Sequence, residues 1–502
     1  MDAQAAKPAR KARGLRRRHV LVGAGAAAGG LAITKALGLY NLPFPANQTQ
    51  SPTAAGIDWI SPLDKLEAQV AHLLRRATFG ATPAEYEQSV KDGFKKTVDR
   101  LVETKAAEPP ALAGAEEASQ EKSIRPQDLI AWWLDWMVRT PTPLAERMTF
   151  FWHGHFTSDF RKVNLQSPFI YWQNLTWRRM SLGNFHDMLY QVTIDPGMLR
   201  YLDLATSTGR NPNENYSREL MELFTMGVGT FTEDDVRSAA KALSGWREPI
   251  TQAMKDALMK RALEQGRPGR NITADAVKTG VFEQQRAYVG AVKFLGETRQ
   301  WDTKSALERV LTQNSVAPFI VTKVLSAFVT DQPADAYVKR LADAFRKSRY
   351  DVKSLMRDVF MSPEFLAPAN YRALVKSPTE LMVNIAKALE TPALATAATA
   401  APALARAVGL PGQSMGQQLF DPPEVGGWPS NASWISSNNV LARVNFAQAT
   451  LTGLAKIPAF NDAHAIHLDG VVSPATAQLL NSSPDDATRW LILLASPEFQ
   501  LK

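Results

Sequence analysis

The chain of 502 residues contains no cysteine. Disulfide bonds, thiolate nucleophiles and cysteine-ligated metals are therefore excluded, and burial with other non-covalent contacts has to stabilise the fold. The chain also lacks the phosphate-binding G-x-x-x-x-G-K-[ST] loop, the dinucleotide-binding G-x-G-x-x-G and the zinc-protease H-E-x-x-H. Nucleotide hydrolysis, dinucleotide redox chemistry and the commonest zinc-protease arrangement thus have no support in the sequence.

The excess positive charge is concentrated at the N-terminus. The formal net charge is +8, and residues 1–18 contain seven Lys and Arg residues against Asp2 alone. Six of the eight net charges therefore lie there, and only two remain for the other 484 residues. A nearly neutral body gives little support for nucleic acid as a partner, because attraction to phosphates supplies most of such binding. We expect no nucleic-acid partner.

The same N-terminal residues resemble an export signal. "GLRRRHVLVGAGAAAGGLAIT" (14–34) joins a basic start and an arginine pair to a Gly- and Ala-rich apolar stretch, which is typical of the twin-arginine pathway. The stretch is shorter than the ~20 residues that span a bilayer, so no stable transmembrane span is expected. We predict passage through the twin-arginine translocase to the periplasm or the extracellular space. The alternative is a disordered basic tail before a short helix.

The body of the chain has the pattern of an all-α protein. Apolar residues recur at helical spacing, and alternating strand patterns are scarce. Thr82, Pro83 and Glu85 form a capping-box pattern, and Thr232 precedes three acidic residues in the same way. Helices are predicted within residues 82–102, 128–138, 169–180, 232–246, 318–329, 335–348, 352–361 and 378–389. We expect a signal and linker in residues 1–55 and one large multi-helix globular domain with long loops in residues 56–502, with a candidate subdivision near 391–412.

Two of the seven histidines lie one residue apart in "FWHGHFTSDF" (151–160). A helix from about Pro143 is predicted to stop at Gly154, because glycine commonly ends helices. Such a break would free His155 to join His153 on one ion, with Asp159 close by. Imidazole with carboxylate suits zinc, iron or manganese. The alternative is that His153 packs between aromatic rings and His155 bonds a carbonyl group.

A second candidate lies in "NPNENYSRELMELFTMG" (211–227). On a helix with 100° per residue, Asn215, Arg218, Glu219 and Glu222 share one arc. Glu219 and Glu222 stand one turn apart, a spacing at which two carboxylates can share an ion or a proton. The alternative is a solvated face on which Arg218 neutralises a glutamate.

A third candidate is the loop "LFDPPEVGGWPSNASWISSNN" (419–439), rich in proline and glycine. It carries Asp421, Trp428 and Trp434, a set that could form a sugar-stacking platform. The same loop could instead only plug onto a helical core.

These segments together resemble a bacterial family of unknown function, DUF 1800. The resemblance runs from about residue 68 to the C-terminus and rests on "HLLRRATFGATPAEY" (72–86), "RMTFFWHGHF" (147–156), the helix-rich stretch 213–246, "LFDPPEVGGWP" (419–429) and "SWISSNNVLARVNF" (433–446). It implies an exported helical protein, often encoded beside a second exported family, DUF 1501, as its partner. The family pattern includes the segments of His153, His155 and Glu219. Many members have a histidine where this chain has Phe224, and a His-Asp segment where it has "EQQRAYVG" (283–290).

Two functional hypotheses follow. In the first, a metal-dependent hydrolase acts on an envelope or extracellular substrate. Its metal ligands are His153, His155, Glu219 and Asp159, and its catalytic residues are Glu222 as base, Arg218 and Asn215. In the second, a non-catalytic binding or assembly protein works with the co-exported partner, and the loop with Asp421, Trp428 and Trp434 contributes to the interface.

Overall fold

A computed structural model describes residues 60–267, 272–391 and 412–502. The predicted signal and linker (1–55) and nearly all of the candidate subdivision near 391–412 lie outside these residues. The fold is all-α apart from two small antiparallel sheets, as the sequence predicts. No helix within the described ranges is long and apolar enough to cross a membrane.

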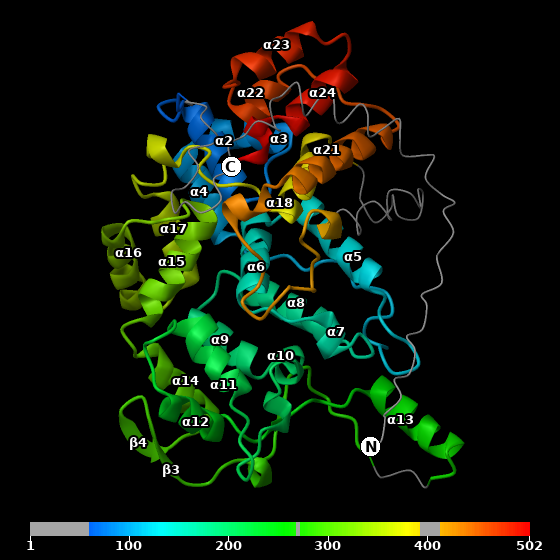
Figure 1. Cartoon of the computed structure of the whole chain (residues 1–502), viewed down its shortest axis with the longest axis vertical. Helices are drawn as coiled ribbons and strands as arrows, with labels where there is room; N and C mark the ends of the chain where they lie inside the picture. Colours follow the sequence, from blue (N-terminus) through cyan, green and yellow to red (C-terminus); the bar gives the residue numbers. More distant parts are fainter. Residues whose placement is uncertain (1–59, 268–271, 392–411) are drawn as a thin grey trace, which may run out of the picture.

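The helices of the first half of the chain start toward the end of the molecule that also holds the C-terminal helices and run through its middle to the opposite end (Figure 1). They are α2 (Leu66–Ala77), α3 (Pro83–Asp92), α4 (Phe94–Glu103), α5 (Pro126–Arg139), α6 (Pro143–His155), α7 (Phe160–Val163), α8 (Phe169–Met180), α9 (Phe185–Thr193), α10 (Pro196–Tyr201), α11 (Asn215–Glu219), the π-helix η3 (Leu220–Thr225), α12 (Glu233–Ala242) and α13 (Gln252–Glu264). Strand β1 (Trp246–Arg247) pairs with β2 (Val281–Phe282), and β3 (Ala291–Phe294) pairs with β4 (Glu297–Gln300).

The second half of the chain returns along the molecule to its opposite end (Figure 1). Its helices are α14 (Thr303–Leu311), α15 (Val316–Phe328), α16 (Asp335–Lys347), α17 (Val352–Phe360), α18 (Pro378–Ala388), α21 (Ser437–Thr452), α22 (Ala463–Leu468), α23 (Pro474–Ser482), α24 (Asp486–Ala495) and α25 (Pro497–Gln500). A hydrophobic core extends through the molecule from Leu73 of α2 to Phe499 of α25. Residues 374–376 pair with the chain end: Leu374 and Lys502 exchange backbone hydrogen bonds of 3.3 and 2.8 Å.

Local sequence signals position most of these helices. The predicted capping boxes are both confirmed: Thr82 with Glu85 begins α3, and Thr232 with Asp235 begins α12. The predicted helix 82–102 is instead two helices, because Gly93 adopts φ +81° and ends α3. Such a left-handed conformation is readily available to glycine alone.

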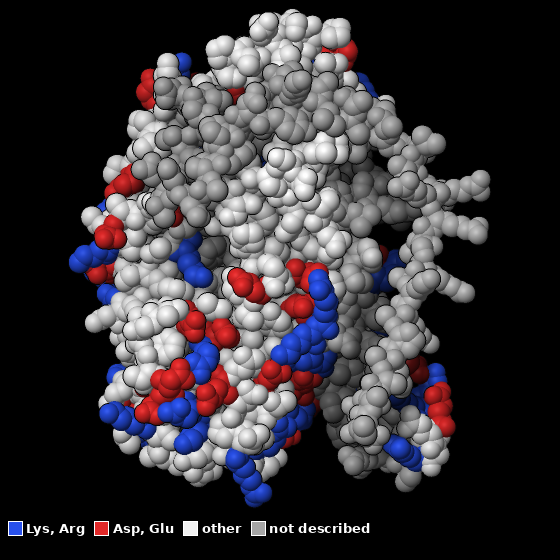
Figure 2. All heavy atoms as spheres, in the orientation of Figure 1, with Lys and Arg blue, Asp and Glu red and all other residues white. Residues whose placement is uncertain are grey.

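Charged side chains of both signs are interspersed on the face shown in Figure 2. They gather over the half of that face that contains α12 and β3–β4, while the visible described surface toward α21 is mainly uncharged.

Candidate functional site

His153 lies in the last turns of α6 and is buried. Its Nε2 accepts a hydrogen bond of 3.2 Å from the backbone N–H of Phe420. The imidazole packs against the rings of Trp133, Phe420 and Trp428, with centroid separations of 4.8, 5.0 and 5.1 Å. Burial lowers the pKa of His153 to about 3, so the ring is neutral near pH 7. The hydrogen bond and ring contacts of His153 therefore hold the tryptophan-bearing loop (residues 417–434) against α6.

His155 is held by a different part of the chain. Helix α6 continues through His155, so the helix end predicted at Gly154 is wrong by one residue. The Nε2–H of His155 donates to the carbonyl oxygen of Phe224 at 3.0 Å. Burial first and Lys323 second lower the pKa of His155 well below its usual value. The two imidazoles thus bond to segments far apart in the sequence, as the packing alternative predicted.

The polar face of the 215–222 segment is largely satisfied by neighbours. Arg218 makes two hydrogen bonds to Glu233, of 2.7 and 2.8 Å, and a longer one to Glu214. The side-chain amide of Asn215 donates to Asp203 at 3.2 Å. The guanidinium predicted to stabilise developing negative charge is therefore already paired with carboxylates.

Glu219 and Glu222 are close enough for their charges to interact, as their spacing predicts. Burial first and Glu222 second raise the pKa of Glu219. Burial, together with the carboxylates of Asp159 and Glu219, raises the pKa of Tyr201 to about 12. Asp159 and Glu219 therefore both lie within electrostatic range of this phenol, whereas neither histidine contributes to this group.

Asp159 acts mainly as a helix cap. Its carboxylate accepts the backbone N–H of Arg161 at 2.5 Å and begins α7. Burial first, and the neighbouring Asp421 further, raise the pKa of Asp159. Asp421 forms an ion pair with the Arg161 side chain and is nearly buried. Asp421 therefore belongs to this cap region.

The predicted joint metal site is not assembled. Within the ranges that the structure describes, no group of three or more His, Cys, Asp or Glu residues could hold a metal ion. The physical reason is that the predicted ligands have other partners: the backbone of Phe420 for His153, the backbone of Phe224 for His155, and the α7 N-terminus for Asp159. Glu219 instead lies within electrostatic range of the Tyr201 phenol.

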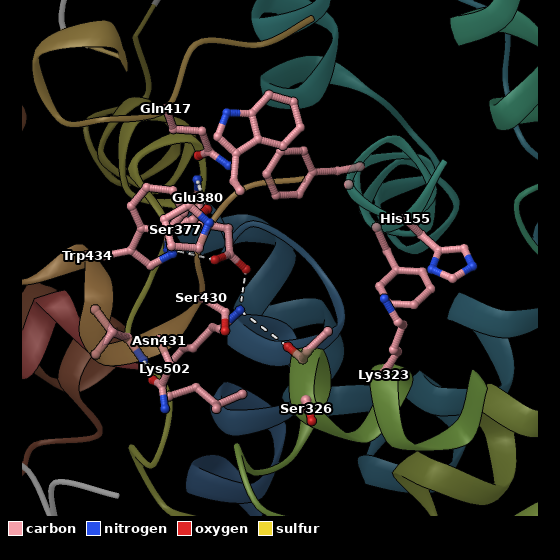
Figure 3. A pocket seen from close by; sticks show the side chains of 18 of the residues that line it. His155, Lys323, Ser326, Ser377, Glu380, Gln417, Ser430, Asn431, Trp434 and Lys502 are labelled. Atoms are coloured by element: carbon pink, nitrogen blue, oxygen red, sulfur yellow. Dashed lines mark hydrogen bonds and ion pairs between the residues drawn. The ribbon is translucent and has the colours of Figure 1, made fainter. Parts of the chain in front are cut away.

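A cavity of about 200 Å³ lies between the tryptophan-bearing loop (residues 417–434) and helices α6 and α15. Its walls come from α6, α15, residues 374–377, the start of α18, the loop residues 417–434 and Lys502 (Figure 3). Trp428 and Trp434 both line it, whereas Asp421 does not. Trp434 is buried against Val375 and Leu501, and Trp428 is half-buried beside His153. The loop therefore both plugs the core and supplies a cavity wall.

The charge around this cavity is unbalanced. Among its lining residues Arg147, Lys323 and Lys502 are basic, and Glu380 is acidic. Arg147 donates to Glu380 at 2.5 Å, and Lys502 forms an ion pair with the same carboxylate. Burial would raise the pKa of Glu380, but the two cations outweigh it and lower the pKa to about 2. Lys323 has no ion pair or hydrogen bond with any described residue.

Three further polar atoms at the cavity lack partners among the described residues. They are Nδ2 of Asn431, Nδ1 of His155 and Nε of Arg147, and all three side chains are more than nine-tenths buried. Buried polar groups are nearly always hydrogen-bonded, so each unsatisfied atom needs an explanation. These three atoms have essentially no accessible surface, so a ligand in the cavity would not reach them without movement of neighbouring side chains.

Sequence reasoning identified His155, Trp428 and Trp434 but missed the polar residues opposite them. Lys323 is the one charged residue of the otherwise apolar helix α15, which is a usable signal. Glu380, Asn431 and Lys502 had no such signal, because their proximity depends on long-range packing.

A serine motif at residues 412–416 lies outside the strand-to-helix turn that the hydrolase pattern requires, as far as the described residues show. Gly412-Gln413-Ser414-Met415-Gly416 fits the G-x-S-x-G pattern of hydrolases, which requires a turn between a strand and a helix. Here Ser414 ends a short helical turn and is exposed. The hollow that Ser414 helps to line contains no histidine or carboxylate.

A family model described as "Protein of unknown function (DUF1800)" matches residues 72–501. The chain belongs to the DUF1800 family. The matched range includes α6, the tryptophan-bearing loop and nearly every lining residue of the cavity. No curated protein and no solved structure matches the chain.

Phe224 occupies the position at which the family resemblance implies a histidine in many members. Its side chain is fully buried and packs edge-on against Phe156 at 5.3 Å. Its carbonyl oxygen is the partner of His155. The position is therefore filled by apolar packing.

Gly427 lets the loop approach α6 closely. It has φ +96°, and a Cβ there would lie 2.6 Å from the carbonyl oxygen of Gly154. We expect Gly427→Ala to displace the loop and lower the free energy of unfolding by ~1–3 kcal/mol. Urea unfolding followed by tryptophan fluorescence would measure this. Gly426→Ala is the matched control, since its nearest contact would be an ordinary 3.6 Å; equal losses in both variants would contradict the close approach.

Proposed function

We propose that this DUF1800 protein is an exported, non-catalytic binding protein that recognises its ligand in the cavity beneath residues 417–434. The observation that carries the proposal is a preformed cavity with two tryptophans and an excess of positive charge, of which Lys323 has no ion pair with any described residue. Concave sites with aromatic walls and a few convergent polar groups are typical of ligand binding.

The metal-dependent hydrolase is less well supported. It needs two imidazoles and a carboxylate around one ion, together with an arginine free to meet developing charge. His153 and His155 instead bond to separate backbone segments, and Arg218 is paired with Glu233. One observation still favours chemistry near Glu219, since it precedes the π-helix η3, and such segments are frequent at functional sites.

Export and partnership complete the proposal. The basic segment and apolar stretch in residues 14–34 support passage through the twin-arginine translocase to the periplasm or beyond. The partner implied by the family resemblance is a co-exported DUF 1501 protein. The exposed residues Pro423, Glu424, Pro429 and Ser430 of the loop are the part of the binding region available to such a partner.

Metal analysis of protein recovered from the periplasm tests the proposal. We expect the wild-type protein in that fraction, and the triple variant Arg16→Lys, Arg17→Lys, Arg18→Lys in the cytoplasm. Elemental mass spectrometry should find well below one equivalent of zinc, iron or manganese, with no difference in the Glu219→Gln variant. Near-stoichiometric metal in the wild type that falls in Glu219→Gln would overturn the binding role in favour of the hydrolase. Circular dichroism would verify that the variant is folded.

A further inference from the structure

The charged residues of the cavity are not all paired. Lys323 and His155 occupy one side in Figure 3, and Asn431 lies on the opposite side beside Trp434. Glu380 is paired with Arg147 and Lys502. Lys323 is therefore the basic lining residue without a carboxylate partner among the described residues.

Lys323 favours an anionic group at its end. Its ammonium is half-buried, lies 5.0 Å from the ring centroid of Phe319 and has no carboxylate partner among the described residues. A charged group that loses water without gaining an opposite charge is costly. A carboxylate would remove that cost, whereas a cationic ligand would face three basic lining residues against Glu380 alone.

His155 Nδ1 and Asn431 Nδ2 lie too deep to select a ligand. Nε2–H of His155 donates to Phe224, which leaves Nδ1 as an acceptor, and Oδ1 of Asn431 accepts from the backbone of Val375 at 2.8 Å. The two remaining atoms have essentially no accessible surface. Lys323 is therefore the group that selects the charge of the ligand.

The size and walls of the cavity limit the ligand to one ring. Its volume of about 200 Å³ is below the ~300–1,000 Å³ of pockets that hold drug-sized molecules. Phe150, Phe151, Trp428 and Trp434 supply aromatic surface around the polar groups. Aromatic rings commonly pack against flat or weakly polar faces of ligands while the ligand edges form hydrogen bonds.

We propose that the cavity binds a single acidic sugar ring, a hydroxylated carboxylate of the uronic acid class, with its carboxylate on Lys323 and a face of its ring against the aromatic walls. This inference rests on the proposed function, because it names the ligand of the same cavity. It makes Lys323 the residue that distinguishes acidic from neutral sugars.

Calorimetric titration of the purified chain at neutral pH tests the proposal. The probes are D-glucuronate, D-galacturonate and D-mannuronate, with D-glucose as the neutral counterpart. We expect at least one uronate to bind at least about tenfold more tightly than glucose, as a charge-assisted hydrogen bond would provide. Lys323→Met should abolish that preference. Lys347→Met, which removes an exposed lysine elsewhere, should retain it.

Two results would overturn the ligand class. They are the absence of a uronate preference in the wild type, and a preference that persists in Lys323→Met. Neither result changes the outcome of the metal measurement, which tests the proposed function separately. Lys323 pairs with no described residue, so its replacement should leave the protein folded, and Lys323→Gln serves as a second uncharged variant.

Discussion

Replacing Glu380 with glutamine is expected to lower the free energy of unfolding by about 3–5 kcal/mol, the cost of removing one partner from a buried ion pair. Glu380 is 5% exposed, and Arg147 and Lys502 around its carboxylate are equally buried. The neutral amide would leave Arg147 buried without its counter-charge, and Lys502, whose pKa burial lowers to about 7, would lose the carboxylate that favours its charged form. The low pKa of Glu380, about 2, reflects how strongly these cations favour its ionised form.

Urea unfolding at neutral pH would measure the loss, with Glu424→Gln as the control. Glu424 is an exposed carboxylate in residues 417–434, the loop that forms one wall of the cavity. Its replacement should change the free energy of unfolding by no more than about 0.5 kcal/mol. The double variant Glu380→Gln, Lys502→Met should be less destabilised than the sum of the single variants, because removing both partners leaves fewer unpaired charges. A loss below about 1 kcal/mol in Glu380→Gln would contradict the buried triad.

The triad explains how distant parts of the chain enclose the cavity. Arg147 comes from α6, Glu380 from the first turn of α18, and Lys502 from the segment paired with residues 374–376. Ser377 and Glu380 also form the capping box of α18, with Ser377 N–H donating to Glu380 at 2.8 Å. One carboxylate therefore both begins a helix and joins three segments beside the proposed ligand.

Local signals were sufficient to predict helices such as α3, α8 and α18, whereas others, such as α9, α14 and α21, were not predicted. Caps such as Thr82 and Thr232 and the apolar periodicity of α8 and α18 act within a few residues, so the sequence carries them directly. The π-helix after Glu219 was not predicted, because its extra residue per turn has no simple sequence pattern. The predicted arc of Asn215, Arg218, Glu219 and Glu222 assumes an α-helix throughout. It therefore applies to the residues of α11, up to Glu219, and not to Glu222 in the π-helix.

The site was predicted less well than the fold for a physical reason. His153 and His155 were predicted to be metal ligands, with aromatic packing of His153 and a carbonyl partner for His155 as the alternative; the partner of each imidazole lies about 70 residues or more away along the chain. Only tertiary packing decides between a metal and a backbone group at such distances. Lys323 and Asn431 likewise line one cavity although they are far apart in sequence, so only tertiary packing brings them together.

His153→Gln is expected to weaken the acid sensitivity of the protein. Burial lowers the pKa of His153 to about 3, below its usual 6.5. Between those values the unfolded chain binds a proton that the folded chain does not, so stability is lost as the pH falls through this window. In this window each such histidine lowers the free energy of unfolding by up to ~1.4 kcal/mol for each pH unit of acidification. Glutamine can still accept the Phe420 N–H but takes up no proton.

Unfolding in urea at pH 7, 6, 5 and 4 measures this slope. His153→Gln should be less stable than the wild type at pH 7, because the packing against Trp133 and Trp428 is imperfect, but it should lose less stability on acidification. His467→Gln provides the matched comparison, since burial first and Lys376 second lower the pKa of His467 to about 3 as well. The two sites are distant, so the double variant should show both reductions added together. An unchanged slope in His153→Gln would mean that the imidazole already takes up a proton in the folded state. Its role as the neutral acceptor that fastens the loop to α6 would then be wrong.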